Sequence, residues 1–205
     1  MSDIRVHRSP PSSRSRARGF TLIEAGVVLC IMGMLVVAVL PSIASWLRGL
    51  RVRAAAESVQ NGLQRARVEA LRRNQEVSFW LMTSANTDGC GDSASSGSWV
   101  VATGSASPSG ACSSSTTVIE SYALPATFSA VSVAATNGGT PVNGVTFNVF
   151  GQVKTGGTPL QKVAVTMPGY SDVRELDIDV TSGGLVRMCD PSVGKTDSRA
   201  CPDAT

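Results

Sequence analysis

The feature that most constrains this chain is a long uncharged run near its N-terminus, headed by a single acid. After Glu24, the 23 residues from Ala25 to Leu47 carry no charge. As a helix rising about 1.5 Å per residue they would extend ~34 Å, enough to cross a bilayer core of ~30 Å. A carboxylate near the centre of such a helix costs roughly 2.5–3.5 kcal/mol. Because no Lys or Arg lies between Phe20 and Leu47, we expect a positively charged partner for Glu24 from outside this segment.

The flanks of the run predict how it is inserted. Five arginines and one aspartate precede it, and this basic bias keeps the N-terminal side cytoplasmic. Trp46 and Arg48 at the other end suit the opposite membrane interface. Two alternatives are a secretory signal peptide cleaved after Ser42-Ile43-Ala44 and a plain membrane anchor, but neither explains Glu24 or Gly19-Phe20.

The residues Arg18-Gly19-Phe20-Thr21-Leu22-Ile23-Glu24, with the basic leader and the apolar run, resemble the start of type IV prepilins and type II secretion pseudopilins. The resemblance implies that a prepilin peptidase cleaves between Gly19 and Phe20 and that the new Phe20 amine is N-methylated. It also implies that Glu24 acts in assembly and that Pro41 bends the helix.

Cleavage would change the charge balance. The full chain has 18 basic and 15 acidic side chains, whereas removal of residues 1–19 leaves 13 and 14. The apparent pI of 8.7 is therefore no argument for a nucleic-acid partner. From residue 48 to 76 arginine exceeds glutamate by seven to three, while from residue 77 onward ten acids face six bases.

A helical pattern continues beyond the apolar run. Its apolar residues recur at three- and four-residue steps and form one stripe, made of Val52, Ala55, Ala56, Val59, Leu63, Ala66 and Ala70. The arginines lie mainly outside the stripe, where we expect them to face solvent or to contact other subunits or lipid headgroups. The run Ala66-Arg67-Val68-Glu69-Ala70, followed by Arg73-Asn74, resembles the end of this helix in the GspH/FimT group of pilins.

The rest of the chain predicts one β-rich domain. Short alternating runs, punctuated by Gly, Pro, Ser and Asn, predict strands at 76–82, 117–122, 145–150, 162–167 and 173–180. Residues 84–117 are rich in Ser and Gly and are expected to form a loop. The predicted fold class is α+β, with a long N-terminal helix packed on a sandwich-like head, as the resemblance to the type IV pilin fold implies. The predicted parts are a leader (1–19), a transmembrane helix (20–47), an amphipathic helix (48–76) and an exported head (77–205).

Four of the five cysteines fall in the exported part, where disulfides persist. Three pairings of Cys90, Cys112, Cys189 and Cys201 are possible, and proximity in sequence favours Cys90–Cys112 and Cys189–Cys201. A zinc site is the alternative, but the sequence has no Cys-x-x-Cys and its only histidine lies in the leader. We therefore expect neither a metal nor a cofactor.

The C-terminal run Gly184-Leu185-Val186-Arg187-Met188-Cys189-Asp190-Pro191 resembles the ending of FimT/FimU-like minor pilins, with Leu185 where an arginine would stand. The resemblance implies DNA contact through this ending in some of these pilins. Arg187, Lys195 and Arg199 are therefore candidate contacts to DNA or to another subunit. Because one arginine is missing and the head is acidic, we expect DNA binding to be weak.

No enzymatic motif is recognisable. The mature chain has no histidine for a His-based triad, and no nucleophile elbow or phosphate-binding glycine loop is present. Glu175, Asp177 and Asp179 alternate along a predicted strand, and we expect a solvated sheet face there, with a cation site or a subunit dock as alternatives.

The sequence as a whole predicts a non-enzymatic minor pilin in a bacterial inner membrane, with its head in the periplasm. Its expected partners are prepilin peptidase and other pilin subunits. The alternatives are a type II secretion pseudopilin of the GspH kind and a DNA-binding pilin for uptake.

Overall fold

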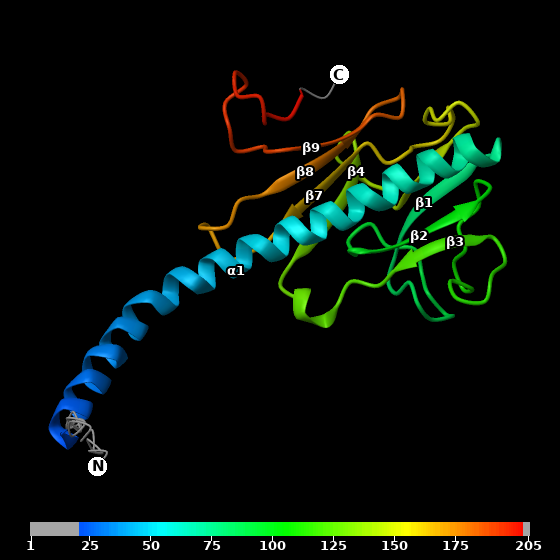
Figure 1. Ribbon diagram of the computed structural model, residues 1–205. Helices are drawn as coiled ribbons and strands as arrows, with labels where there is room; N and C mark the ends of the chain where they lie inside the picture. Colours follow the sequence, from blue (N-terminus) through cyan, green and yellow to red (C-terminus); the bar gives the residue numbers. More distant parts are fainter. Residues whose placement is uncertain (1–20, 203–205) are drawn as a thin grey trace, which may run out of the picture. The chain divides into compact units, whose positions relative to one another are not determined.

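The structure is a computed structural model that describes residues 21–202. One long helix, α1 (Leu22–Arg73), precedes nine strands and the short 3-10 helix η1 (Ala126–Phe128) (Figure 1). The chain divides after Pro41 into two compact units. The first contains the apolar start of α1, and the second contains the rest of α1 together with all the strands.

In the first unit, the large apolar side chains from Leu22 to Leu40 are exposed. Soluble proteins rarely expose a continuous apolar surface of this length. Helix α1 is long and apolar enough, by length and composition, to cross a membrane. The helical assignment includes Pro41.

In the second unit, α1 buries one face. All seven residues of the predicted stripe, from Val52 to Ala70, are at most 1% exposed. The residues of the stripe therefore all face the core. Helix α1 ends at Arg73 rather than at residue 76, because Asn74 adopts a left-handed conformation with φ of 52°, which terminates the helix in the manner of a C-cap.

The strands form two antiparallel sheets. The first has the order β3-β2-β1-β6 and the second β5-β4-β7-β8-β9. Their bounds are β1 (Val77–Met82), β2 (Ser98–Thr103), β3 (Val118–Tyr122), β4 (Ser132–Asn137), β5 (Thr140–Pro141), β6 (Gly144–Phe147), β7 (Lys162–Thr166), β8 (Leu176–Val180) and β9 (Val186–Cys189).

One hydrophobic core joins the helix to both sheets. It combines the α1 stripe with Phe79 and Trp99 of the first sheet and with Val163 and Ile178 of the second. The predicted α+β class, a long helix packed on a β-rich head, is therefore confirmed.

The prediction of a loop over residues 84–117 was wrong in its centre. This segment contains β2, which pairs with β1 from Val77↔Thr103 to Met82↔Ser98 and with β3 on its other side. Four of its six residues are apolar in an unbroken run, which is typical of a central strand buried on both faces. The Ser- and Gly-rich surroundings concealed this short run.

Other strands differ in length or were not predicted. Strand β6 ends at Phe147, because the Asn148 side chain accepts hydrogen bonds from the backbone N–H groups of Phe150 (2.9 Å) and Gln152 (3.1 Å) and so forms a turn. Strand β8 begins at Leu176 rather than at residue 173. Strands β4, β5 and β9 were missing from the prediction. The apolar residues of β4 and β5 are few and small, and β9 is only four residues long.

Candidate functional site

The expected processing and assembly residues lie at the start of the chain. Gly19 and Phe20 fall outside the described residues. Glu24 lies in the first turn of α1, where its negative charge is favoured by the positive end of the helix dipole. The Thr21 hydroxyl accepts a hydrogen bond from the backbone N–H of Glu24 (3.3 Å). This cap was not predicted, although Thr-x-x-Glu before an apolar run is the signature of a capping box.

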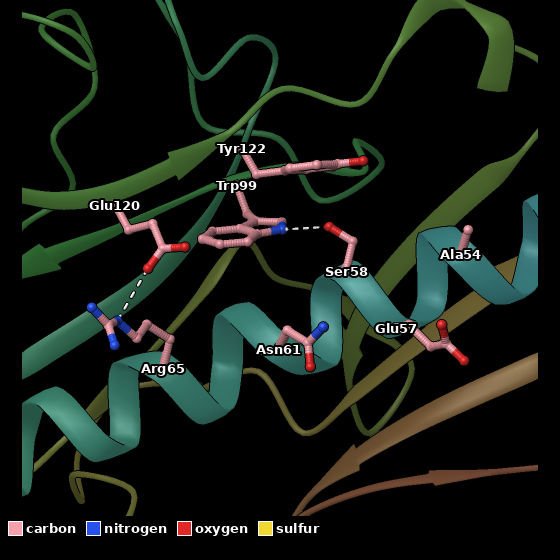
Figure 2. Close-up of a pocket in the computed structure, with 8 residues that line it drawn as sticks. All are labelled: Ala54, Glu57, Ser58, Asn61, Arg65, Trp99, Glu120 and Tyr122. Atoms are coloured by element: carbon pink, nitrogen blue, oxygen red, sulfur yellow. Dashed lines mark hydrogen bonds and ion pairs between the residues drawn. The ribbon is translucent and has the colours of Figure 1, made fainter.

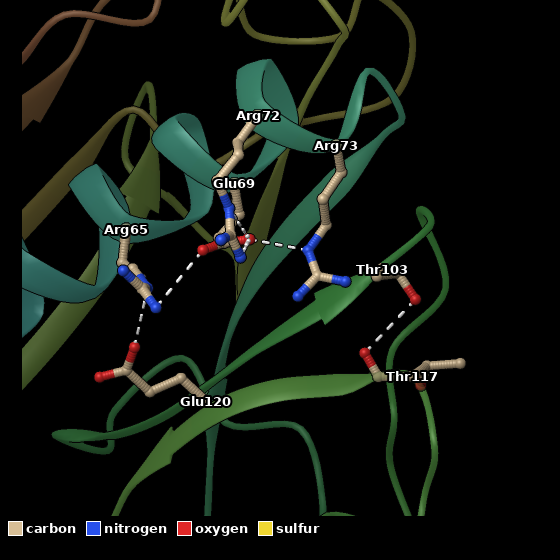
Figure 3. Close-up of polar contacts among 7 residues, drawn as sticks. All are labelled: Arg65, Glu69, Arg72, Arg73, Thr103, Thr117 and Glu120. Carbon is tan, nitrogen blue, oxygen red and sulfur yellow. Dashed lines mark hydrogen bonds and ion pairs between the residues drawn. The ribbon is translucent and has the colours of Figure 1, made fainter.

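At the other end of α1, three arginines surround one buried carboxylate. Glu69 is 1% exposed and accepts hydrogen bonds from Arg73 Nε (2.7 Å) and Arg72 Nη2 (2.8 Å). Arg65 Nη2 lies 3.4 Å from its other oxygen, and Arg65 Nε lies 3.1 Å from Glu120 of β3. Figure 3 shows how this cluster connects the helix to the edge of the first sheet. These arginines therefore form internal ion pairs, an outcome that the sequence analysis did not consider.

The Glu69 cluster makes stability depend on pH. Hydrogen bonds from Arg73 and Arg72 lower the pKa of Glu69 below its ordinary value, although burial opposes them. This carboxylate therefore stabilises the fold above the ordinary pKa, and the contribution is lost as pH falls through the lowered pKa of the folded state.

We expect Glu69→Gln to lower the free energy of unfolding by about 1–2 kcal/mol at neutral pH, since hydrogen bonds to charged groups are strong but water screens the half-exposed arginines. The difference should vanish in acid. Urea unfolding of a soluble head fragment across the acid range measures it. Glu57→Gln is the matched control, because the exposed Glu57–Arg53 pair on the same helix should contribute at most about 0.5 kcal/mol. Equal losses in both variants at neutral pH would contradict the prediction.

An open groove of about 650 Å³ lies between α1 and the β3 edge (Figure 2). Trp99 lines it, donates a hydrogen bond to Ser58 Oγ (3.0 Å) and stacks on Tyr122 with ring centroids 5.8 Å apart. The acids of the groove are ion-paired, Glu57 to Arg53 and Glu120 to Arg65. Its lining residues include no histidine or cysteine, and none of them pairs a nucleophile with a general base.

The C-terminal loop follows β9 and is joined back to it by the Cys189–Cys201 disulfide. Arg187 Nη2 donates hydrogen bonds to the carbonyl oxygens of Ser198 (2.9 Å) and Ala200 (3.2 Å). Arg199 binds Asp197 at 2.7 Å, and hydrogen bonds from Arg199 lower the pKa of Asp197 to about 2. Arg187 and Arg199, which were predicted as DNA contacts, are therefore engaged within this loop.

The other residues singled out in the sequence lie at different places in the structure. Lys195 lies in the same loop, between Cys189 and Cys201. Leu185, which stands where the resemblance implies an arginine, is 56% exposed. A second disulfide joins Cys90 to Cys112, and Cys30 is a free cysteine in the apolar part of α1.

The prediction of a solvated acidic face on β8 was wrong for Asp177. Asp177 is 3% exposed and forms an ion pair with Lys162 Nζ at 2.7 Å. The C-terminal disulfide covers this face, since Cys201 Sγ lies 3.8 Å from Asp177 and Cys189 Sγ lies 3.3 Å from Asp179. Burial raises the pKa of Asp179. Asp179 and these two cysteines come close enough to share a metal, but the disulfide leaves no thiolate to bind one.

We expect non-reducing peptide mapping of the exported head to recover the 90–112 and 189–201 pairs. Each closes a short loop with little apolar content, and the chain-entropy estimate for such a loop is about 3 kcal/mol. Replacing both Cys189 and Cys201 by serine should therefore lower the midpoint of urea unfolding and expose the 190–201 segment to proteases. Four free thiols in periplasmic protein would contradict this prediction.

These features together define a class of protein. An exposed apolar helix whose continuation packs on a small antiparallel head is the architecture that the resemblance to type IV pilins predicted. The family model described as type II transport protein GspH matches residues 55–184, more than half of the chain. The chain belongs to the GspH family.

The comparison with solved structures found a distant similarity. Two crystal structures of the type IV minor pilin FimU of Pseudomonas aeruginosa PAO1 were matched, in space groups P65 and P21. The first is 15% identical, with a TM-score of 0.45 over 69% of this chain and 94% of that chain. The second is 17% identical, with a TM-score of 0.46 over 69% and 90%. No significant match to a curated protein was found.

Proposed function

We propose that this chain is a minor pilin, stored in the inner membrane by residues 20–47 and incorporated into a type IV pilus at its tip or in its initiating complex. The observation that carries the proposal is the exposed apolar start of α1, headed by Glu24, in a member of the GspH family. Prepilin peptidase is the expected processing partner, acting between Gly19 and Phe20.

The proposed mechanism is assembly by helix packing. In the fibre, the apolar side chains of α1 would exchange lipid contacts for contacts with neighbouring pilin helices. The Glu24 carboxylate would meet a positively charged N-terminal amine of another subunit. In an environment without water such a pair is strongly favoured over the unpaired carboxylate.

A second candidate is a pseudopilin of a type II secretion system, which the description of the matched family favours. Deletion of the chain separates the two. Loss of surface pili with normal secretion supports the minor pilin, and detection of the chain by mass spectrometry in sheared pili adds to it. Normal piliation with substrates retained in the periplasm would instead support the pseudopilin.

We expect duplex DNA to bind the head no more tightly than about 10⁻⁴ M at physiological salt, the weak end of non-specific binding. The side chains of Arg187 and Arg199 already bind groups within the C-terminal loop, and the head carries an excess of acid. Titration of DNA into a soluble fragment starting near Arg51 measures this. Micromolar affinity that falls on Arg187→Ala or Arg199→Ala would overturn the prediction and favour a DNA-uptake role.

A further inference from the structure

The connection between β7 and β8 contacts α1 where the uncharged run ends. Arg48 is the first charged residue after that run, and its Nη2 donates a hydrogen bond to Asp172 Oδ2 at 2.7 Å. Its guanidinium carbon also lies 4.5 Å from the centre of the Tyr170 ring, within cation–π range. These two contacts hold the tip of the connection against this turn of the helix.

Large apolar and aromatic side chains remain exposed around this contact. Trp46 is 64% exposed, Leu47 and Leu50 are 43% exposed and Tyr170 is 45% exposed. We call these four residues, with Arg48, the collar. Trp46 and Tyr170 each combine an apolar ring with a polar tip, which is the combination enriched at membrane interfaces.

Four arginines lie in or beside the collar. Arg51 and Arg53 follow Arg48 on α1. Arg48 also pairs with Asp172, and Arg53 pairs with the exposed Glu57. Arg174 at the end of the β7–β8 connection is 56% exposed, while its partner Asp190 is buried. Arginine binds phosphate oxygens through paired N–H groups and needs little dehydration to do so.

We propose that the collar is a lipid-headgroup contact, so that the β7–β8 connection of the stored subunit lies on the bilayer surface. The inference rests on the proposed function, because it requires the uncharged run to span the membrane. A helical run of ~34 Å only slightly exceeds a bilayer core of ~30 Å. Leu47 must then lie at the edge of the hydrocarbon, and the tip held by Arg48 lies at the depth of the phosphates.

Site-specific photo-crosslinking of the full chain tests the collar. The photoreactive residue p-benzoylphenylalanine is incorporated in place of Tyr170 in one variant and of Phe150 in another. Phe150 is the matched control, since it is an exposed aromatic residue (74%) of the same unit. It adjoins Gly151, whose carbonyl binds Arg67, and Arg67 lies 19 residues further along α1 than Arg48, or ~28 Å at the helical rise. Each variant is reconstituted into vesicles of phosphatidylethanolamine and phosphatidylglycerol and irradiated. The mass of the intact protein is then measured by mass spectrometry.

We expect a phospholipid adduct in the variant with the photoreactive residue at position 170 and no such adduct in the variant with it at position 150. Adducts at both positions would overturn the inference, because they would reflect contact without a preferred surface. An adduct to a second protein chain at position 170, or none at all, would also overturn it. Flotation with the vesicles is scored separately, so failure to float refutes the membrane anchor of the proposed function, whereas flotation without a lipid adduct refutes only the collar.

Discussion

Replacing Glu24 with alanine is expected to leave processing intact and to abolish incorporation into pili. The peptidase site at Gly19-Phe20 is unchanged in this variant, but the carboxylate that would bind the N-terminal amine of a neighbouring subunit is lost. Inside a water-free bundle of helices no other group near this position could replace it, since Ala25 to Leu47 carry no charge. Immunoblots of sheared pili and of membranes measure the two outcomes separately.

Two further variants serve as controls, one for other changes in the helix and one for cleavage. Cys30→Ala changes a small exposed residue on the same helix and should assemble normally. Substitution of Gly19 by a bulky residue should block cleavage, so intact-mass analysis would find the full precursor. If the wild-type membrane protein began at Met1 or at Ser45, or if Glu24→Ala entered pili at the normal level, the prepilin interpretation would be refuted.

Gly184→Ala is expected to destabilise the head by about 3–5 kcal/mol, a large part of the total for a small domain. Gly184 lies in the turn between β8 and β9 with φ of 79°, and a Cβ there would meet the backbone oxygen of Gly151 at 1.9 Å. Neither backbone segment can move easily. The Ser182 carbonyl accepts a hydrogen bond from Val153 N–H (3.0 Å), and the Gly151 carbonyl accepts one from Arg67 (3.1 Å).

Two alanine controls separate the steric clash from the backbone strain. Gly183→Ala, one residue earlier, has a φ that alanine adopts readily and only Thr181 Oγ1 nearby, at 3.9 Å, so it should be nearly neutral. Gly169→Ala has φ of 86° and no neighbour within 4 Å, and should cost only the left-handed strain of about 1–2 kcal/mol. Urea unfolding of the three variants measures how much free energy of unfolding each one loses. A loss for Gly184→Ala no larger than that for Gly169→Ala would exclude the clash.

Gly184 also belongs to a sequence motif whose role could be predicted only in part. The C-terminal run from Gly184 to Pro191 was recognisable by resemblance, and its arginine suggested contact with DNA. In the structure Gly184 allows a close backbone approach and Arg187 binds the carbonyls of the C-terminal loop. Motif spacing contains no information about a carbonyl that is 11 or 13 residues away in sequence but next to the side chain in space.

Local patterns were sufficient to predict the elements that depend on neighbouring residues. The uncharged run, the stripe from Val52 to Ala70 and the α+β class follow from periodicity and composition, because a helix buries residues at fixed steps along its own sequence. Each of these features is set within a few turns of chain. The sequence by itself therefore determined the long apolar helix, its continuation with one buried face and the presence of a β-rich head.

Only the tertiary structure decided what the charged residues do. Asp177 was predicted to face solvent, and Arg187 was a candidate contact to DNA or to another subunit, yet each binds groups of its own chain. No partner was predicted for Glu69, which binds arginines of its own helix. Burial of a charge depends on which distant segments cover it: the arginines over Glu69 and the C-terminal disulfide over Asp177. The order of the strands, the place of β2 inside the first sheet and the contact of Arg48 with Tyr170 were decided in the same way, by pairings between residues that are far apart in the chain.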